Sequence, residues 1–330
     1  MPGAGDSSPA PGFGDRLAAA VSARESQIVL GIDPDPARLW PDPREATGQQ
    51  RERLAVALVD TADAAGAPGP APAAAEAAAA VLVHCRALID AAAPACVAAK
   101  PQLACFERLG FAGALALEAV CAHARAAGLL VLADGKRGDV PVTAAVYSQA
   151  LTGSTPSPFG PVPGLGVDCL TANPLLGRDA LAPLVDGARR AGAGVFVLVR
   201  TSNPGAADLL DLELADGGAL WERLAAVVEE LGTTGRAGLA DVGAVTGATA
   251  PQHLARMREL MPKTPFLLPG VGAQGGDVST LAPVFAPGRA AGLVTASRSI
   301  AQAYEQAAGD PPAAARSEAE RLRDLAWTLV

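Results

Sequence analysis

Residues 129–140 read LLVLADGKRGDV, and this stretch decides the expected fold of the chain. The apolar run 129–133 suits a buried strand, and a cluster of charged residues follows it directly. Burying an unpaired charge costs several kcal/mol, so a strand that ends in this way is poorly suited to extending a core. We therefore expect the strand to end at the rim of a pocket, with the rim formed by Asp134, Lys136, Arg137 and Asp139.

Short apolar runs of this kind recur along the chain and alternate with longer Ala-, Leu-, Arg- and Glu-rich segments that suit helices. The runs are rich in Val, Ile and Leu without polar alternation, which is typical of strands covered on both faces. Eight such strands with helices between them predict an α/β fold, a (β/α)8 TIM barrel. Besides 129–134, the runs are 28–33, 96–101, 168–173, 194–202, 239–247, 265–272 and 292–298.

We expect residues 1–330 to form a single barrel domain with added segments, because the chain exceeds the typical barrel length of about 250 residues. Residues 1–13 are rich in Pro, Gly, Ser and Ala and are expected to be disordered. An Ala/Pro-rich insertion, 63–80, separates the first two strands. Its centre, 65–74, suits a flexible loop, and an Ala-rich helix is expected after it through roughly residue 91. A second loop is expected at 152–167.

The composition argues against several classes of partner and cofactor. A net charge of −8 disfavours nucleic acid and anionic membranes, which need a basic face, and 4% aromatic residues are too few for base-stacking platforms. The five cysteines form no Cys-x-x-Cys pair and the three histidines lack metal-ligand spacing, so we expect reduced thiols, no metal site and a cytoplasmic location. No uncharged apolar run reaches membrane-spanning length and no dinucleotide fingerprint occurs, so we expect neither a membrane segment nor a cofactor.

Polar or charged side chains stand at the expected carboxyl ends of the strands, where barrels of this type build their active sites. Taken alone, each has a plainer explanation. Asp33 and Asn173 precede prolines and could form turns. Asp139 could cap the helix that begins near residue 140, and Arg298 could be a surface charge. Their coincidence at one rim indicates a site, and its expected members are Asp33, Lys100, Asp134, Lys136, Asn173, Ser202 and Arg298.

The segment 270–276, GVGAQGG, follows the seventh expected strand and has four glycines in seven residues. Such a loop lets backbone N–H groups approach an anion closely, although it could also be a plain turn. Barrels frequently bind phosphate after their seventh and eighth strands, and Arg298 ends the eighth. We therefore expect a phosphate site in which Arg298 gives charge-assisted hydrogen bonds and Gln274 a neutral one.

Seven segments, in order along nearly the whole barrel, resemble the orotidine 5′-phosphate decarboxylase family, specifically its longer subgroup found in actinobacteria and related organisms. The DGKRGD element, together with Lys100 and the PGVGAQGGD segment, is highly specific. The matching segments are GIDPDP (31–36), AKPQLACFE (99–107), ADGKRGDV (133–140), LTANPLLG (170–177), RTSNPGA (200–206), PGVGAQGGD (269–277) and SRSI (297–300).

The resemblance implies a cofactor-free enzyme that converts orotidine 5′-phosphate (OMP) to uridine 5′-monophosphate (UMP) and CO₂ in pyrimidine biosynthesis. Lys100, Asp134, Lys136 and Asp139 would form the family's alternating array of ammonium and carboxylate groups. Lys136 would donate the proton to C6 of the pyrimidine, and Asp134 would lie against the substrate carboxylate.

Further roles are implied by the same resemblance. Asp139 and Thr143 would reach into the site of a neighbouring subunit, which makes the expected enzyme a homodimer. Asp33 and Lys100 would hold ribose hydroxyls, and Ser202 would contact the base. The remaining expected contacts to the substrate, with the phosphate bound by Gln274 and Arg298, are Asn173, Gly272, Gln274, Gly275 and Arg298.

Two alternatives remain open at this point. The first is a Mg²⁺-dependent sugar-phosphate decarboxylase or aldolase of the same barrel superfamily. In those relatives we expect a carboxylate where this chain has Lys100, and a cation cannot ligate Mg²⁺. The second is a non-catalytic nucleotide-binding barrel, which should keep the phosphate loop but lose the charged array. Insensitivity to EDTA would argue against the first alternative, and a decarboxylation assay tests both.

Overall fold

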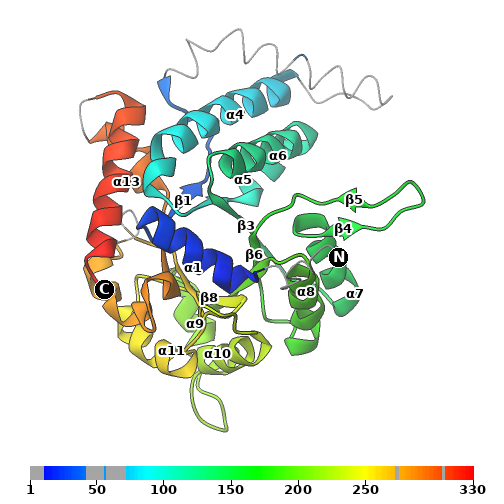
Figure 1. Cartoon of the computed structure of the whole chain (residues 1–330), viewed down its shortest axis with the longest axis vertical. Helices are drawn as coiled ribbons and strands as arrows, with labels where there is room; N and C mark the ends of the chain where they lie inside the picture. Colours follow the sequence, from blue (N-terminus) through cyan, green and yellow to red (C-terminus); the bar gives the residue numbers. More distant parts are fainter. Residues whose placement is uncertain (1–10, 42–55, 57–71, 272–274, 307–308) are drawn as a thin grey trace, which may run out of the picture.

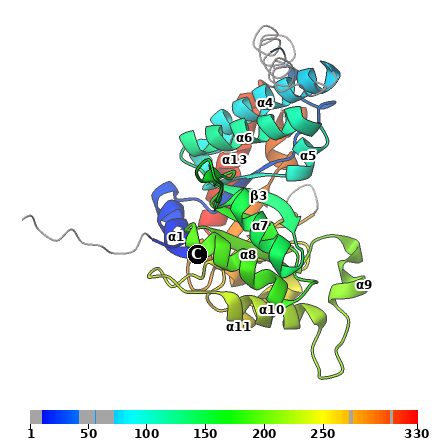
Figure 2. The same cartoon turned by 90° about the vertical axis from the view of Figure 1, so that its right-hand side faces the viewer.

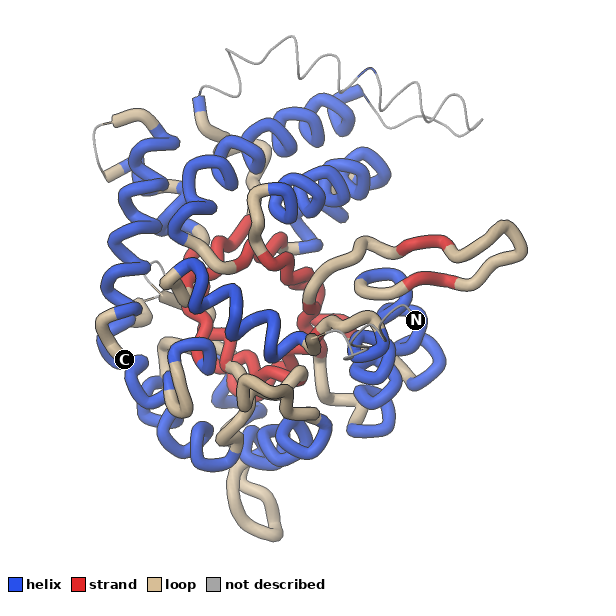
Figure 3. Tube along the Cα trace, in the orientation of Figure 1, coloured by secondary structure: helices blue, strands red, loops and turns tan. Residues whose placement is uncertain are grey.

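The structure, a computed structural model, describes residues 11–41, 56, 72–271, 275–306 and 309–330 (Figure 1). Eight parallel strands close into a barrel in the order β1-β10-β9-β8-β7-β6-β3-β2, the ring of strands in Figure 3. Each predicted apolar run coincides with one of them, so the (β/α)8 barrel is confirmed; β3 alone continues past its predicted end at residue 134, to Arg137. The strands are β1 Ile28–Ile32, β2 Ala98–Pro101, β3 Leu130–Arg137, β6 Cys169–Ala172, β7 Gly194–Arg200, β8 Val242–Thr246, β9 Phe266–Leu268 and β10 Gly292–Ala296.

Helices surround the barrel, and several have clear sequence causes. In α8 the buried residues follow a helical period along one face, from Ala180 and Leu181 to Leu184. Before α13 the Asp310 carboxylate accepts a hydrogen bond from the Ala313 N–H at 3.3 Å, an N-cap. The helices described are α1 Phe13–Arg24, α4 Pro72–Ala92, α5 Leu103–Glu107, α6 Gly110–Ala126, α7 Pro141–Leu151, α8 Arg178–Arg190, α9 Ala207–Leu210, α10 Leu220–Leu231, α11 Leu254–Leu260, α12 Arg298–Ala301 and α13 Pro311–Trp327, with 3₁₀ turns at Ala93–Ala95, Pro204–Ala206, Pro251–His253, Val278–Phe285, Arg289–Ala291 and Ala303–Glu305.

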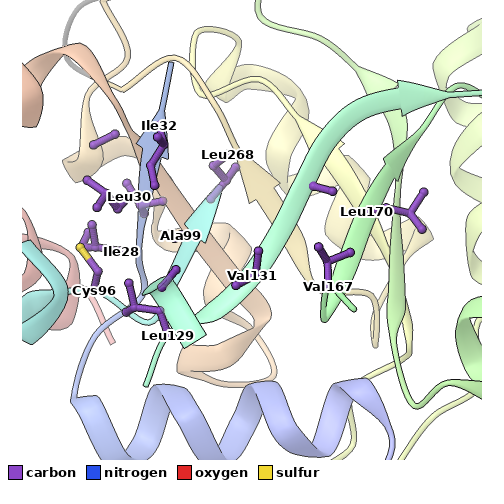
Figure 4. Close-up of a cluster of buried hydrophobic side chains, with 14 of the residues drawn as sticks. Ile28, Leu30, Ile32, Cys96, Ala99, Leu129, Val131, Val167, Leu170 and Leu268 are labelled. Carbon is purple, nitrogen blue, oxygen red and sulfur yellow. The ribbon is translucent and has the colours of Figure 1, made fainter. Parts of the chain in front are cut away.

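The core has two parts, because successive side chains of each strand point to opposite faces. On β1, Ile28, Leu30 and Ile32 belong to the cluster between the strands and the helices, part of which Figure 4 draws. Val29 belongs instead to the cluster inside the barrel, together with Phe196 of β7. The strands are therefore buried on both faces, which explains why their sequences are continuously apolar.

Helix α1 crosses the amino-terminal end of the barrel (Figure 3). Its Phe13 ring meets the Phe196 ring edge to face at 5.9 Å, and a Cβ on Gly194 would lie 2.3 Å from the Phe13 ring. Phe13 is 1% exposed, so the predicted disorder of residues 1–13 is wrong at this position. Burying this large apolar ring at the end of the barrel releases more free energy than the loss of conformational entropy in ordering the chain there costs. Residues 1–10 lie outside the described residues.

The predicted insertion 63–80 divides at residue 72. Residues 63–71 lie outside the described residues, whereas 72–80 form the first turns of α4, so the helix begins inside the predicted loop centre 65–74. In the described chain, Pro72–Ala95 is long and apolar enough to cross a membrane. Most of its apolar window is buried, and α4 packs beside α6 (Figures 1 and 2). The length and composition of α4 are thus those of a core helix.

The predicted loop 152–167 contains two short antiparallel strands, β4 Ser154–Thr155 and β5 Val162–Pro163. They form a hairpin that projects from the body of the molecule (Figure 1). Phe159, between the two strands, is 99% exposed.

Candidate active site

A cavity of about 460 Å³ opens at the carboxyl ends of the barrel strands. It falls in the size range of small-ligand sites. Its floor is apolar, with side chains such as Leu198, Val245 and Leu267, and charged groups stand around it. The cavity brings together these residues that the sequence predicted: Asp33, Lys100, Asp134, Lys136, Ser202 and Arg298.

The Asp134 carboxylate is the centre of the site and accepts four hydrogen bonds. Its Oδ2 accepts from Lys100 Nζ at 2.7 Å and from Gln102 Nε2 at 3.2 Å. Its Oδ1 accepts from Lys136 Nζ at 2.7 Å and from Thr171 Oγ1 at 2.9 Å. Both Lys100 and Asp134 are buried, whereas the Lys136 side chain, which also lines the cavity, is 44% exposed. A buried carboxylate is therefore held between two ammonium groups.

This geometry keeps the buried pair charged. Burial opposes ionisation of Asp134, but the two ammonium groups and their hydrogen bonds lower its pKa to about 2. Burial likewise opposes the charged form of Lys100, but the Asp134 and Asp33 carboxylates outweigh it and raise the pKa of Lys100 above its ordinary value. At neutral pH the cavity thus presents a fixed carboxylate and a fixed ammonium group.

A distortion at the end of β3 places Lys136. The pairing of β3 with β6 shifts between Ala133 and Arg137, and Lys136 has a φ of +45°. This left-handed conformation costs a non-glycine residue about 1–2 kcal/mol. The Lys136 N–H donates to Thr171 Oγ1 at 2.8 Å, so a side chain of β6 supports the distorted backbone. Strain that is held in this way is typical of functional sites.

Four predicted site residues in the described chain do not line the cavity: Asp139, Thr143, Asn173 and Gly275. The Asn173 Oδ1 accepts a hydrogen bond from the Leu175 N–H at 3.1 Å, so Asn173 forms the turn that the sequence analysis gave as its plainer explanation. The Asp139 carboxylate accepts from the Val140 N–H at 2.7 Å, while Val140 itself is the N-cap of α7 and no side chain caps that helix. The cap proposed for Asp139 is therefore absent, and its carboxylate keeps capacity for another partner.

The expected phosphate end of the cavity is partly described. Gly270 has a φ of +101°, a conformation that favours glycine, and the Gly276 N–H donates to its carbonyl at 2.9 Å, which closes the loop. Gly275 also has a positive φ, +88°, whereas Gly272 and Gln274 lie outside the described residues. Arg298 begins α12 and is exposed on the cavity wall. Among the described residues no hydrogen bond or ion pair occupies its guanidinium.

The fourth charge of the opening cluster, Arg137, is not part of the cavity. Its guanidinium pairs with the Glu107 carboxylate and lies 5.5 Å from the centre of the Tyr147 ring. Arg137 therefore ties the end of β3 to α5 and α7, a structural role.

Two of the residues that bond to Asp134 were not singled out by the sequence analysis: Gln102 and Thr171. Gln102 directly follows β2, and the strand-end criterion could have included it. Thr171 needed the inward–outward alternation of β6, where Cys169 belongs to the interior cluster and Thr171 is the next inward position. Within the described chain, no group of three or more His, Cys, Asp or Glu residues could hold a metal ion.

Comparisons with known proteins agree with one another. Residues 49–316 match the model of the orotidine 5′-phosphate decarboxylase / HUMPS family. An orotidine 5′-phosphate decarboxylase from Deinococcus radiodurans is 45% identical over 240 residues, which cover 72% of this chain and 81% of that protein.

Two solved structures are also similar. A putative orotidine 5′-phosphate decarboxylase from Streptomyces avermitilis superposes with a TM-score of 0.72 at 29% identity, over 97% of this chain and 96% of that one. UMP synthase from Leishmania donovani superposes with a TM-score of 0.68 at 30% identity, over 96% of this chain and 57% of that longer one.

Proposed function

We propose that this chain, which belongs to the orotidine 5′-phosphate decarboxylase family and is a carboxy-lyase of pyrimidine biosynthesis, decarboxylates OMP by electrostatic stabilisation of a carbanion at C6, with Lys136 as the proton donor. One observation carries this mechanism. The buried Asp134 carboxylate lies between the ammonium groups of Lys100 and Lys136, 2.7 Å from each, in the wall of a small-ligand cavity.

The reaction needs a fixed positive charge. The bond between C6 and the carboxylate breaks, CO₂ leaves, and the electron pair remains on C6 without a conjugated acceptor. An ammonium group held beside C6 stabilises that developing charge, because a preorganised charge does not have to reorient during the reaction. Lys136 then transfers a proton from Nζ to C6 and recovers one from solvent, which its 44% exposed side chain can reach.

Asp134 has a second effect in this mechanism. With a pKa of about 2 it is ionised at neutral pH and would face the substrate carboxylate. The repulsion between the two anions is relieved as the substrate carboxylate becomes neutral CO₂ and its negative charge passes to C6. The repulsion therefore raises the energy of the bound substrate more than that of the transition state. Lys100 keeps this carboxylate ionised and, together with Asp33 at the same rim, would hold the ribose hydroxyls.

The phosphate supplies binding energy away from the reacting carbon. The exposed Arg298 guanidinium can give the phosphate two parallel hydrogen bonds. Gly270 and Gly275, with positive φ, shape a loop whose N–H groups can approach the same anion. Binding at this remote group can be used to order the reacting end of the site. Ser202, on the cavity wall, would contact the base, and Gly272, Gln274 and Asn173 remain proposed contacts.

We also propose that the active form is a homodimer in which Asp139 and Thr143 reach the partner's cavity. Two features support this. Neither residue lines the cavity of its own subunit. Beside them, Val140, Val142 and Val146 are more than half exposed, an apolar surface on and before α7 that a second subunit would cover. A cytoplasmic location remains part of the proposal and fits the free state of the five cysteines.

The proposed mechanism is tested by replacing Lys136. In an assay that follows the loss of orotate absorbance, Lys136→Ala should abolish turnover and retain UMP binding. Lys263→Ala is the matched control, because Lys263 is exposed at the opposite end of the barrel, before β9. Appreciable turnover by Lys136→Ala would remove the proton-donor role, and absence of turnover by the unmodified protein would refute the activity itself.

A further inference from the structure

One hydroxyl group contacts both Asp134 and Lys136. Thr171, 1% exposed on the inner face of β6, accepts a hydrogen bond from the Lys136 N–H at 2.8 Å and donates one to Asp134 Oδ1 at 2.9 Å. The two roles fit each other, because a hydroxyl has a single proton and an ionised carboxylate can only accept. The direction of the hydroxyl is thereby fixed by its two partners.

This hydroxyl also spans a break in the sheet. Ala133 pairs with Leu170 and Arg137 with Ala172, so β3 contains a bulge opposite this part of β6. Inside the bulge the Lys136 N–H bonds to the Thr171 side chain. The main-chain ladder resumes where the Asn173 N–H donates to the Arg137 carbonyl at 2.8 Å.

We propose that Thr171 is a positioning residue for decarboxylation, a proposal that rests on the function assigned above. Its hydroxyl holds the backbone of Lys136 in the left-handed conformation and fixes the Asp134 carboxylate that the Lys136 ammonium contacts. The proton donor and the carboxylate are thereby set relative to each other before substrate arrives.

The need for such a support follows from the lysine itself. The side chain of lysine has four flexible carbons, so the ion pair with Asp134 alone leaves several positions open to the Lys136 Nζ. The backbone of Lys136 is also in a strained left-handed conformation, which needs a support of its own. Displacing a reacting group by about 1 Å can cost about a hundredfold in rate. The effect of losing Thr171 should therefore appear in kcat and only weakly in the binding of UMP, which needs no proton transfer.

Three variants test this role: Thr171→Val, which keeps the shape and removes both hydrogen bonds, Thr171→Ala, which also relieves any packing conflict, and Thr171→Ser, which keeps the hydroxyl. We expect kcat to fall about 10- to 100-fold in Thr171→Val and Thr171→Ala, and the Kd of UMP to change less than about threefold. Thr171→Ser should restore kcat to within about threefold of the unmodified enzyme.

The matched control is Thr246→Val. Thr246, in β8, is equally buried, does not line the cavity, and its hydroxyl has no hydrogen-bond partner among the described residues. It should leave kcat unchanged. A kcat for Thr171→Val within threefold of the unmodified enzyme, or a Thr171→Ser variant as slow as Thr171→Val, would overturn the positioning role.

A substrate-independent measurement separates this proposal from the proposed function. A crystal structure of Thr171→Val, or of Thr171→Ala if that variant folds better, should show Lys136 leaving its φ near +45° or losing its contact with Asp134. An unchanged Lys136 would overturn the positioning role even if the chain did not act on OMP. A failure of the unmodified protein to release CO₂ from OMP would instead refute the function alone.

Discussion

The strongest test of the charged site is the stability of Asp134→Asn as a function of pH. Asparagine has the shape of aspartate without its charge, so the variant resembles the protein with Asp134 protonated. In the folded protein burial opposes ionisation, but Lys100 and Lys136 lower the pKa of Asp134 from its ordinary value of 3.8 to about 2. The folded state therefore favours the ionised form, and the free energy of unfolding must depend on pH.

The size of the effect follows from that pKa difference. Nearly two units at about 1.4 kcal/mol each give a stabilisation of about 2 kcal/mol. Because the pKa is depressed, this contribution is complete above the unfolded value of 3.8 and disappears as the pH falls through about 2. Asp134→Asn should thus be less stable than the unmodified protein by about 2 kcal/mol at pH 6 and by about 1 kcal/mol at pH 3.

The assay is urea unfolding followed by circular dichroism at one fixed protein concentration, because an oligomer's stability depends on concentration. Other titrating groups are common to both proteins and cancel in the difference. Asp186→Asn is the control: its carboxylate is 56% exposed and pairs with Arg189 at 3.2 Å, so the change should stay below about 1 kcal/mol at either pH. A difference for Asp134→Asn that is independent of pH would refute the reasoning.

Three further outcomes are expected. Arg298→Ala should raise the KM for OMP about 10- to 100-fold with a small effect on kcat, because it removes charge-assisted hydrogen bonds to the phosphate; an unchanged KM in steady-state kinetics would contradict this. EDTA should leave turnover unchanged, and reactivation by added Mg²⁺ after EDTA treatment would favour the metal-dependent alternative. Burial lowers the pKa of His84 from 6.5 to about 4, and its Nδ1 accepts from the Trp40 N–H at 3.3 Å. As the pH falls, the unfolded state therefore binds a proton before the folded state does. The free energy of unfolding, measured by urea titration, should fall by about 3 kcal/mol between pH 6.5 and 4. A free energy of unfolding that stays constant over this range would contradict the burial of His84.

The barrel could be predicted from sequence because its strands are buried on both faces. That environment leaves a continuous apolar run, such as Ile28–Ile32, which needs no alignment to be recognised. Asp134 and Lys136 could be recognised for a related reason. A charged residue directly after a buried apolar run costs free energy unless it is paired, so its presence there indicates a functional site.

Other parts of the site depend on contacts that a linear pattern does not contain. The proposed role of Thr171 rests on its bonds to β3, which lie where the register of β3 against β6 shifts. The burial of Phe13 depends on the small residue Gly194 beneath it. Asp139 lies outside its own cavity, so its proposed role concerns a second chain and could be suggested only by resemblance.

The two ammonium groups of the site belong to a residue type that is rare in this chain. The chain has three lysines in 330 residues, and its other strong cations are arginines. Of the three, Lys100 is buried, Lys136 is partly exposed and Lys263 is exposed at the far end of the barrel. Reductive methylation with ¹³C would therefore give an NMR spectrum with three lysine signals beside that of the amino terminus, and Lys263→Ala would assign one of them. The protonation state of the proposed donor could then be followed against the signal of a single surface lysine, Lys263.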